Sequence, residues 1–331
     1  MTTALPATPD VALAAHDLVK TYPTGRKTEP VRALDGLSLQ VPVGTVFGLL
    51  GRNGAGKSTT VKILTTLSRP DAGTAQVAGL DVTRQPGRVR RVIGLVSQKA
   101  SSDPIATGRE NLVLAARIQG LSSRDATRRS AELLDRFDLA DSADRQVRTY
   151  SGGMARKLDV AIGLVHRPRV LFLDEPTAGL DPEARSEMWH EIARLADQEQ
   201  MTVLLTTHYL DEADRLADQL AIVDHGRVIA TGSPDELKRR LRGDTVTVEF
   251  ADVPIAEKAR ATLAEAGQVR DLTLTGAVLR GRADQGATAV PAVLLTLERA
   301  GITAASVSVA RPTLDDVYLD QVGHSFQEDQ R

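Results

Sequence analysis

The 331-residue chain contains no cysteine. This absence excludes disulfide bonds, cysteine-ligated zinc, iron–sulfur clusters and thiol catalysis. No stretch approaches the run of about 18 apolar residues that a membrane-spanning helix needs. The N-terminus, MTTALPATPD, also lacks the basic n-region and the long apolar h-region of a signal peptide. The sequence therefore predicts a soluble, cytoplasmic chain that would act at a membrane only through a partner.

The chain also lacks an excess of positive charge. It has 41 basic and 43 acidic residues, a formal net charge of −2, which argues against a nucleic-acid partner. Its length suggests two domains. Residues 1–14 are expected to form a mobile tail, residues 15–240 a first domain, and residues 244–331 a smaller accessory domain. The accessory domain has 8 basic and 13 acidic residues, so it is a poor candidate for binding phosphate groups.

Hydrophobic periodicity predicts an α/β fold for the first domain. Short apolar runs alternate with segments of helical period, which indicates a mainly parallel sheet covered by helices. In the accessory domain the predicted order is βαββαβ, typical of a ferredoxin-like α+β domain. The strands expected in the first domain are Phe47–Leu50, Val92–Val96, Val170–Leu173, Val203–Thr206 and Gln219–Val223.

A glycine-rich loop follows the strand that ends at Leu50. The segment GRNGAGKS, residues 51–58, fits the pattern G-x-x-x-x-G-K-[ST] between a strand and an amphipathic helix. Glycines let backbone amides surround a phosphate, and the helix N-terminus adds its dipole. Lys57 would supply a positive charge to the β- and γ-phosphates, and the Ser58 hydroxyl could ligate Mg²⁺. The segment is therefore predicted to bind a nucleoside triphosphate.

Two carboxylates end the apolar run VLFLDE, residues 170–175. Ligands of open α/β sheets bind beyond the carboxyl ends of the strands, so Asp174 is expected to face the same crevice as Lys57. One carboxylate suits Mg²⁺. The other, Glu175, suits orienting and deprotonating the attacking water.

A second helix N-terminus suited to anions is predicted at YSGGM, residues 150–154. One chain has no evident need for two such sites on one nucleotide. We therefore expect Ser151 and the glycines that follow it to bind the nucleotide held by another copy of the chain. Two copies would then form a homodimer.

Taken together, these motifs resemble an ATP-binding-cassette (ABC) ATPase over residues 15–235. The phosphate loop, Gln98, the SGG signature, LFLDEP, the segment AGLD that ends at Asp181, and TTHYLDEAD follow the family's order. The resemblance implies a P-loop NTPase cassette with a helical subdomain at about residues 99–166, and ATP and Mg²⁺ as cofactors. Met154 stands where many members have glutamine, and residues 23–30 lengthen the segment after Tyr22.

The resemblance also implies roles for individual residues. Glu175 and His208 would be catalytic, and Ser58, Gln98 and Asp174 would hold Mg²⁺. Tyr22 would stack on adenine, and Asp181 would act across the dimer. The signature Ser151, Gly152, Gly153 and Met154 would act in trans. The expected ATP-binding residues are Tyr22, Gly51, Arg52, Asn53, Gly54, Ala55, Gly56, Lys57, Ser58, Thr59 and Gln98.

The C-terminal segment RPTLDDVYLDQVG narrows the resemblance to the ATPases of daunorubicin-resistance-type drug exporters. Such a subunit would sit on the cytoplasmic face of a bacterial membrane and drive a separate membrane-spanning permease. A lipid, ion or nutrient transporter remains an alternative at this point, as does an ABC ATPase without a transport role. A DNA-repair member would carry a coiled coil or a zinc motif between the phosphate loop and the signature, and this chain has neither heptads nor cysteine there.

Overall fold

The structure is a computed structural model that describes residues 11–23, 30–241 and 243–322. The chain divides into two compact units after Pro234. Nearly all of helix α8 (Pro234–Arg240) therefore belongs to the second unit, although the sequence analysis expected the first domain to run to residue 240. None of the helices formed by the described residues is long and apolar enough to span a membrane.

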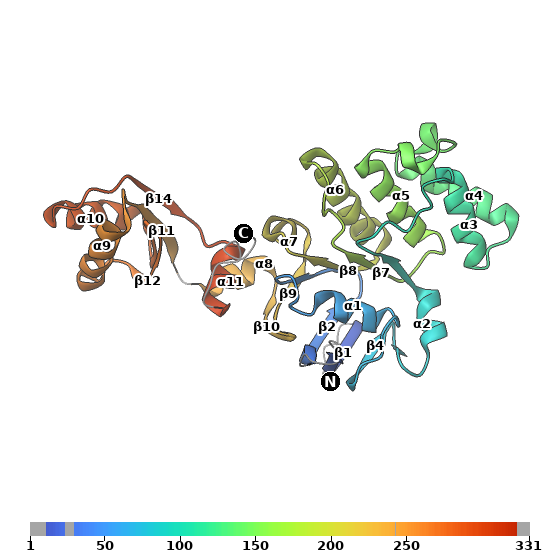
Figure 1. Ribbon diagram of the computed structural model, residues 1–331, viewed down its shortest axis with the longest axis horizontal. Coiled ribbons are helices and arrows are strands. Elements are labelled where there is room, and N and C mark those ends of the chain that lie inside the picture. Colours follow the sequence, from blue (N-terminus) through green and yellow to red (C-terminus); the bar gives the residue numbers. More distant parts are fainter. Residues whose placement is uncertain (1–10, 24–29, 242, 323–331) are drawn as a thin grey trace, which may run out of the picture. The chain divides into compact units, whose positions relative to one another are not determined.

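A six-stranded sheet forms the centre of the first unit (Figure 1). The strand order is β10-β9-β3-β8-β7-β6, with β10 antiparallel to β9 and the remaining pairs parallel. The prediction of a mainly parallel α/β sheet is thus confirmed. The strands are β3 (Val46–Leu50), β6 (Ile93–Val96), β7 (Val170–Asp174), β8 (Thr202–Thr207), β9 (Gln219–Asp224) and β10 (Arg227–Gly232).

Both faces of this sheet are buried because each covers a separate hydrophobic cluster. In β7, Leu171 and Leu173 join the cluster under helices α3 to α6, whereas Val170 and Phe172 join the cluster that includes α1 and the N-terminal strands. This alternation explains why the central strands are apolar along their whole length. The helices of the first unit are α1 (Lys57–Leu64), α2 (Pro86–Val92), α3 (Gly108–Ile118), α4 (Ser123–Arg136), α5 (Gly152–Leu164), α6 (Pro182–Glu199) and α7 (Leu210–Leu216).

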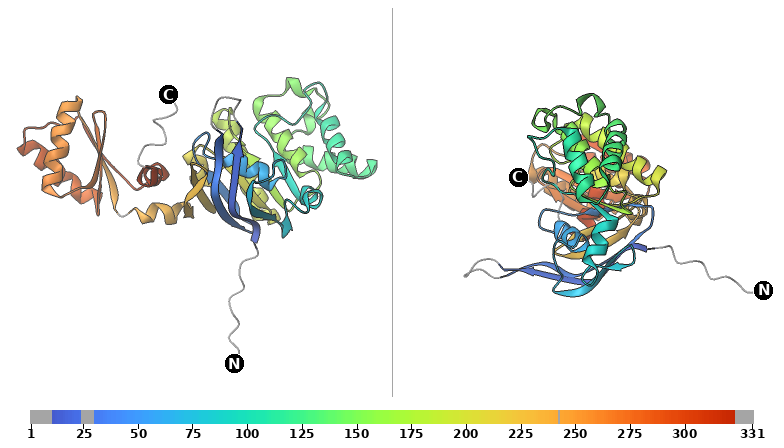
Figure 2. Two further views of the ribbon diagram at one scale, coloured as in Figure 1. Left: turned by 60° about the horizontal axis from the view of Figure 1, so that its bottom comes forward. Right: turned by 90° about the vertical axis from the view of Figure 1, so that its right-hand side faces the viewer.

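An antiparallel sheet in the order β2-β1-β4-β5 packs on the second of these clusters. Helices α3, α4 and α5, in green, lie at the opposite end of the first unit from β1 and β2, in blue (Figure 2). The tail expected at residues 1–14 is wrong for residues 11–14, which belong to strand β1. This strand begins at Val11 because Leu13 and Ala15 are fully buried and pair with β2, while residues 1–10 lie outside the described part of the chain. The strands are β1 (Val11–Tyr22), β2 (Val31–Pro42), β4 (Ala72–Val77) and β5 (Leu80–Asp81).

The second unit contains an antiparallel sheet with the order β12-β13-β11-β14. The chain order βαββαβ with this strand order is the expected ferredoxin-like arrangement. Helix α11 follows it, and its first-turn carboxylates Asp315 and Asp316 lie 3.8 and 3.9 Å from the guanidinium groups of Arg280 and Arg282 on β13. The elements are β11 (Asp244–Glu249), α9 (Val253–Ala266), β12 (Arg270–Thr275), β13 (Val278–Ala283), α10 (Gly286–Arg299), β14 (Ser306–Ala310) and α11 (Leu314–Val322).

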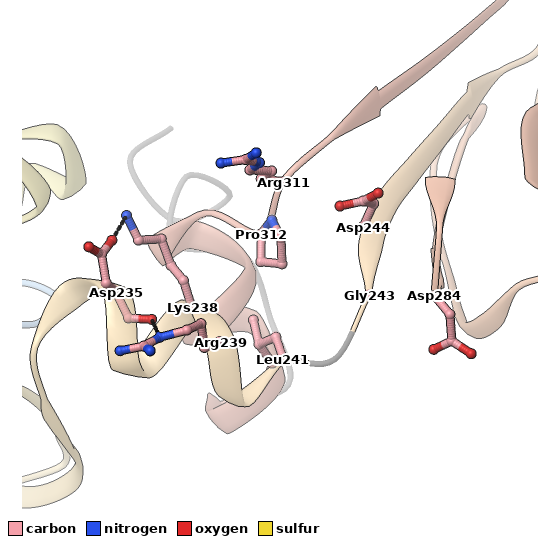
Figure 3. Close-up of a pocket in the computed structure, with 9 residues that line it drawn as sticks. All are labelled: Asp235, Lys238, Arg239, Leu241, Gly243, Asp244, Asp284, Arg311 and Pro312. Atoms are coloured by element: carbon pink, nitrogen blue, oxygen red, sulfur yellow. Dashed lines mark hydrogen bonds and ion pairs between the residues drawn. The ribbon is translucent and has the colours of Figure 1, made fainter. Parts of the chain in front are cut away.

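A pocket of about 740 Å³ lies within the second unit, lined by residues of α8, the ends of β11 and β13, and the segment after β14 (Figure 3). Three of its side chains are basic and three are acidic, and Lys238 pairs with Asp235 at 3.1 Å. The pocket therefore does not favour a ligand of one charge sign. Its charged side chains are Asp235, Lys238, Arg239, Asp244, Asp284 and Arg311.

Candidate nucleotide site

The glycine-rich loop joins β3 to α1, as the sequence predicted. Gly54 and Gly56 have φ angles of 84° and 112°, a region that side chains with a Cβ rarely adopt. At Gly56 a Cβ would also lie 2.7 Å from the carbonyl oxygen of Ala33. Both positions thus require glycine, and the loop places the free amides of the α1 N-terminus where a phosphate can accept from them.

Lys57 lies inside this loop and is only 4% exposed. Its Nζ donates to the carbonyl oxygens of Gly51 at 2.6 Å and Arg52 at 3.1 Å. Burial lowers the pKa of Lys57, and the negative charges of Glu175 and Asp174 oppose that shift. The ammonium group is therefore held at the loop by neutral carbonyl acceptors, which anionic phosphate oxygens can replace with bonds between two charged groups.

Asp174 is brought next to the phosphate loop by β7. Its Oδ1 accepts from Ser58 Oγ at 3.3 Å and from Thr206 Oγ1 at 2.6 Å. Two oxygen ligands that the sequence assigned to a metal thus meet although they are 116 residues apart. The sequence predicted no role for Thr206, although this residue opens the motif TTHYLDEAD, because a threonine at the end of a buried strand carries no functional pattern of its own.

Glu175 lies between the side chains of Gln98 and His208. Its Oε2 accepts from Gln98 Nε2 at 3.0 Å, and its Oε1 lies 3.2 Å from His208 Nδ1. The backbone of Glu175 has a φ of 50°, a strained value for a residue with a side chain. Its amide donates to Thr206 Oγ1 at 3.1 Å, which helps to hold that conformation. Gln98 and His208, predicted from separate motifs, are thereby brought to the carboxylate of Glu175.

The signature residues open helix α5. Ser151 is the N-cap, and its Oγ accepts from the Met154 amide at 3.2 Å. Gly153 faces the start of α6, where a Cβ on the glycine would lie 2.9 Å from the Cβ of Ala184. Asp181 is exposed and caps α6 by accepting from the Ala184 amide at 2.9 Å. The roles expected for these residues toward a second copy stay predictions.

Tyr22 ends strand β1 and pairs with Val31 of β2. Lys20 Nζ lies 5.6 Å from the centre of the Tyr22 ring, a cation–π distance. Most of the long segment after Tyr22, residues 24–29, lies outside the described residues. Stacking of Tyr22 on adenine therefore stays a prediction.

Comparison with known proteins identifies this arrangement. The family model "ABC transporter" matches residues 34–178, and the model "ATP-binding protein DrrA1-3-like, C-terminal domain" matches residues 232–322. The chain is 47% identical over 317 residues to the daunorubicin/doxorubicin resistance ATP-binding protein DrrA of Streptomyces peucetius. This match covers 96% of this chain and 94% of that protein. The chain belongs to the ABC transporter family. It is an ATP-binding, ATP-hydrolysing ABC subunit of the DrrA-like type.

Other proteins resemble this ABC subunit in sequence or in fold. It is 32% identical over 318 residues to the linearmycin resistance ATP-binding protein LnrL of Bacillus subtilis, with coverage of 96% of this chain and 100% of that protein. A solved ATP-binding cassette, a dimer in a post-hydrolysis state with ADP and Pi bound, shares the fold with a TM-score of 0.61 and 24% identity. That match covers 67% of this chain and 98% of the other.

Proposed function

We propose that this ABC subunit powers the export of hydrophobic antibiotics through a separate membrane-spanning permease. The observation that supports ATP hydrolysis as the power source is the position of Glu175, a carboxylate at the end of β7 held between Gln98 and His208. The resistance functions in the names of its relatives, against daunorubicin, doxorubicin and linearmycin, support the cargo class.

In the proposed reaction, ATP and water give ADP and phosphate. The loop amides and Lys57 bind the β- and γ-phosphates, and Glu175 accepts the proton of the attacking water. The amide group of Gln98, bonded to Glu175, orients that carboxylate toward the water. His208 lies on the other side of the carboxylate and steadies the γ-phosphate.

We propose that Mg²⁺ accompanies the ATP. Ser58 Oγ and Asp174 Oδ1, 3.3 Å apart, are oxygen ligands of the kind that Mg²⁺ prefers, and Gln98 would complete the protein's share. Within the described residues no group of three or more histidine and acidic side chains could hold a metal by itself. Phosphates and water would supply the other ligands, as is usual for this ion, whose charge would offset that of the phosphates.

We further propose that two copies of the subunit act together on the cytoplasmic face of a bacterial membrane, since ATP is available there. Each ATP would lie between the phosphate loop of one copy and the signature, Ser151 to Met154, of the other. The exposed N-terminus of α5, with free glycine amides, supports this arrangement. The solved cassette with the same fold is a dimer.

The test is transport by the reconstituted complex. The subunit is co-expressed with a candidate membrane-spanning permease, purified, and placed in liposomes with daunorubicin as the fluorescent probe. We expect ATP-dependent uptake of the drug into vesicles whose ATP sites face outward, and ATP turnover that rises when drug is added. Loss of both signals in the Glu175→Gln complex is the control. Steady ATP turnover that daunorubicin and linearmycin leave unchanged would contradict the proposed cargo class.

A further inference from the structure

Arg156 connects the signature helix to the catalytic strand end. It lies on α5, five residues after Ser151, and is 8% exposed. Its Nη1 donates to the carbonyl oxygen of Ser97 at 2.7 Å, and its Nε donates to that of Pro176 at 2.7 Å. Its Nη2 donates to the carbonyl oxygens of Asp174 at 3.2 Å and Glu175 at 3.1 Å. One guanidinium group thus holds the backbone on both sides of the proposed base.

Asp159, one turn further along α5, holds the other end of the Gln98 segment. It is 3% exposed, and its Oδ1 accepts from the amides of Ser101 at 3.0 Å and Ser102 at 3.1 Å. The segment that carries Gln98 is therefore attached to α5 at both ends, by Arg156 before Gln98 and by Asp159 after it.

Burying the charges of Arg156 and Asp159 has a cost in desolvation free energy. Burial lowers the pKa of Arg156 and raises the pKa of Asp159, and the attraction between the two charges opposes both shifts. Apolar residues at these two positions would avoid the desolvation cost. They would also leave four carbonyl oxygens and two amides without these partners, so the two charged side chains serve to bond the backbone around Glu175 and Gln98.

We propose that Arg156 is a positioning residue that couples the N-terminus of α5 to Glu175 and Gln98, with Asp159 as its support. A helix moves as a rigid rod over one or two turns, so a displacement at Ser151 is passed to Arg156, about 7.5 Å further along the axis. Arg156 passes it to the carbonyl group of Glu175, which also accepts from the Ala178 amide at 3.3 Å, while the amide of this strained residue donates to Thr206. Engagement of the signature by a nucleotide thereby adjusts the base. This inference rests on the proposed function of Glu175 and of the signature.

The test replaces Arg156 by lysine, which keeps the charge but cannot donate in four directions. We expect kcat for ATP to fall by about 10- to 100-fold, the usual effect of a misplacement near 1 Å, with KM within about 3-fold. The matched control is Arg129→Lys. Arg129 lies on α4 and donates to the carbonyl oxygens of Leu164 and Val165 at the other end of α5. Its replacement should leave kcat within about 2-fold.

A second measurement separates positioning from folding. In a Glu175→Gln background, where bound ATP is not consumed, Arg156→Lys should still trap ATP in a dimer, and its thermal midpoint should match that of Arg129→Lys. Unchanged kcat would overturn the proposal. So would a fall in trapping as large as the fall in kcat, or a thermal midpoint clearly below that of Arg129→Lys, since the role would then be structural. If the wild-type chain itself failed to hydrolyse ATP, the proposed function would fail instead, which is a distinguishable result.

Discussion

Replacing Glu175 by glutamine should lower ATP turnover by about 10²- to 10⁴-fold, the usual contribution of a positioned base. Glutamine has the shape of glutamate and keeps an oxygen that can accept from Gln98, whose amide lies 3.0 Å from the carboxylate. It cannot accept a proton from water. ATP affinity should therefore stay within about 3-fold of the wild-type value, because Lys57 and the loop amides are untouched.

The measurement pairs phosphate release with equilibrium titration of ATP on the same preparations. Glu257→Gln is the matched control, since this residue is an exposed acid on α9 of the second unit and its replacement removes the same charge. Turnover near the wild-type rate in the Glu175→Gln variant would exclude Glu175 as the base. A parallel loss of ATP affinity would assign it to binding instead.

Replacing Lys57 by alanine should weaken ATP binding itself. A hydrogen bond to a charged group contributes about 1.5–3 kcal/mol, which corresponds to roughly 10- to 150-fold in affinity. Since Lys57 is buried, Lys57→Met serves as a second variant that fills the same space without the ammonium group. Titration with a fluorescent ATP analogue measures the effect.

Lys62 provides the control for this measurement. It lies in the last turn of the same helix α1 and is exposed, so Lys62→Ala removes an equal charge without touching the loop. Its ATP affinity should equal that of the wild type. A Lys57 variant that keeps full affinity but loses turnover would show that the ammonium group acts in the reaction and not in binding.

Much of the candidate site follows from local sequence patterns. The phosphate loop needs glycine at particular positions, and Gly54 and Gly56 do adopt backbone angles that favour it. Apolar strands that end in polar residues place Ser58 and Asp174 at the same edge of a parallel sheet, and the two side chains meet there. The family order of motifs added Gln98 and His208, which the structure brings to Glu175.

Other parts depend on tertiary packing and leave no local signal. In the sequence, Arg156 and Asp159 are two charged residues on a helix with nothing to distinguish them. Only the folded chain shows which carbonyl and amide groups they bond. The contact between Gly153 and Ala184 arises because α5 and α6 begin side by side. Likewise, the start of β1 at Val11 is set by pairing with β2, not by the composition of the N-terminus.

Trapping of ATP by mixed dimers tests whether each ATP lies between two copies of the chain. One variant carries Lys57→Ala, and the other carries Gly152→Asp, whose carboxylate repels the γ-phosphate. Gly152 suits this change better than Gly153, because a Cβ there would find only Leu180 Cδ2, at 3.8 Å. Both variants also carry Glu175→Gln so that bound ATP is not hydrolysed.

Each variant alone forms dimers in which both sites are defective, so neither should trap ATP. In a mixed dimer one site combines an intact Lys57 with an intact signature, and the other site collects both defects. We expect mixing to restore up to one trapped ATP per mixed dimer, counted with radiolabelled nucleotide after gel filtration. If mixing restores nothing, while a control mixture of Lys57→Ala chains with chains of wild-type loop and signature does trap ATP, the signature acts within its own chain and ATP does not lie between two copies.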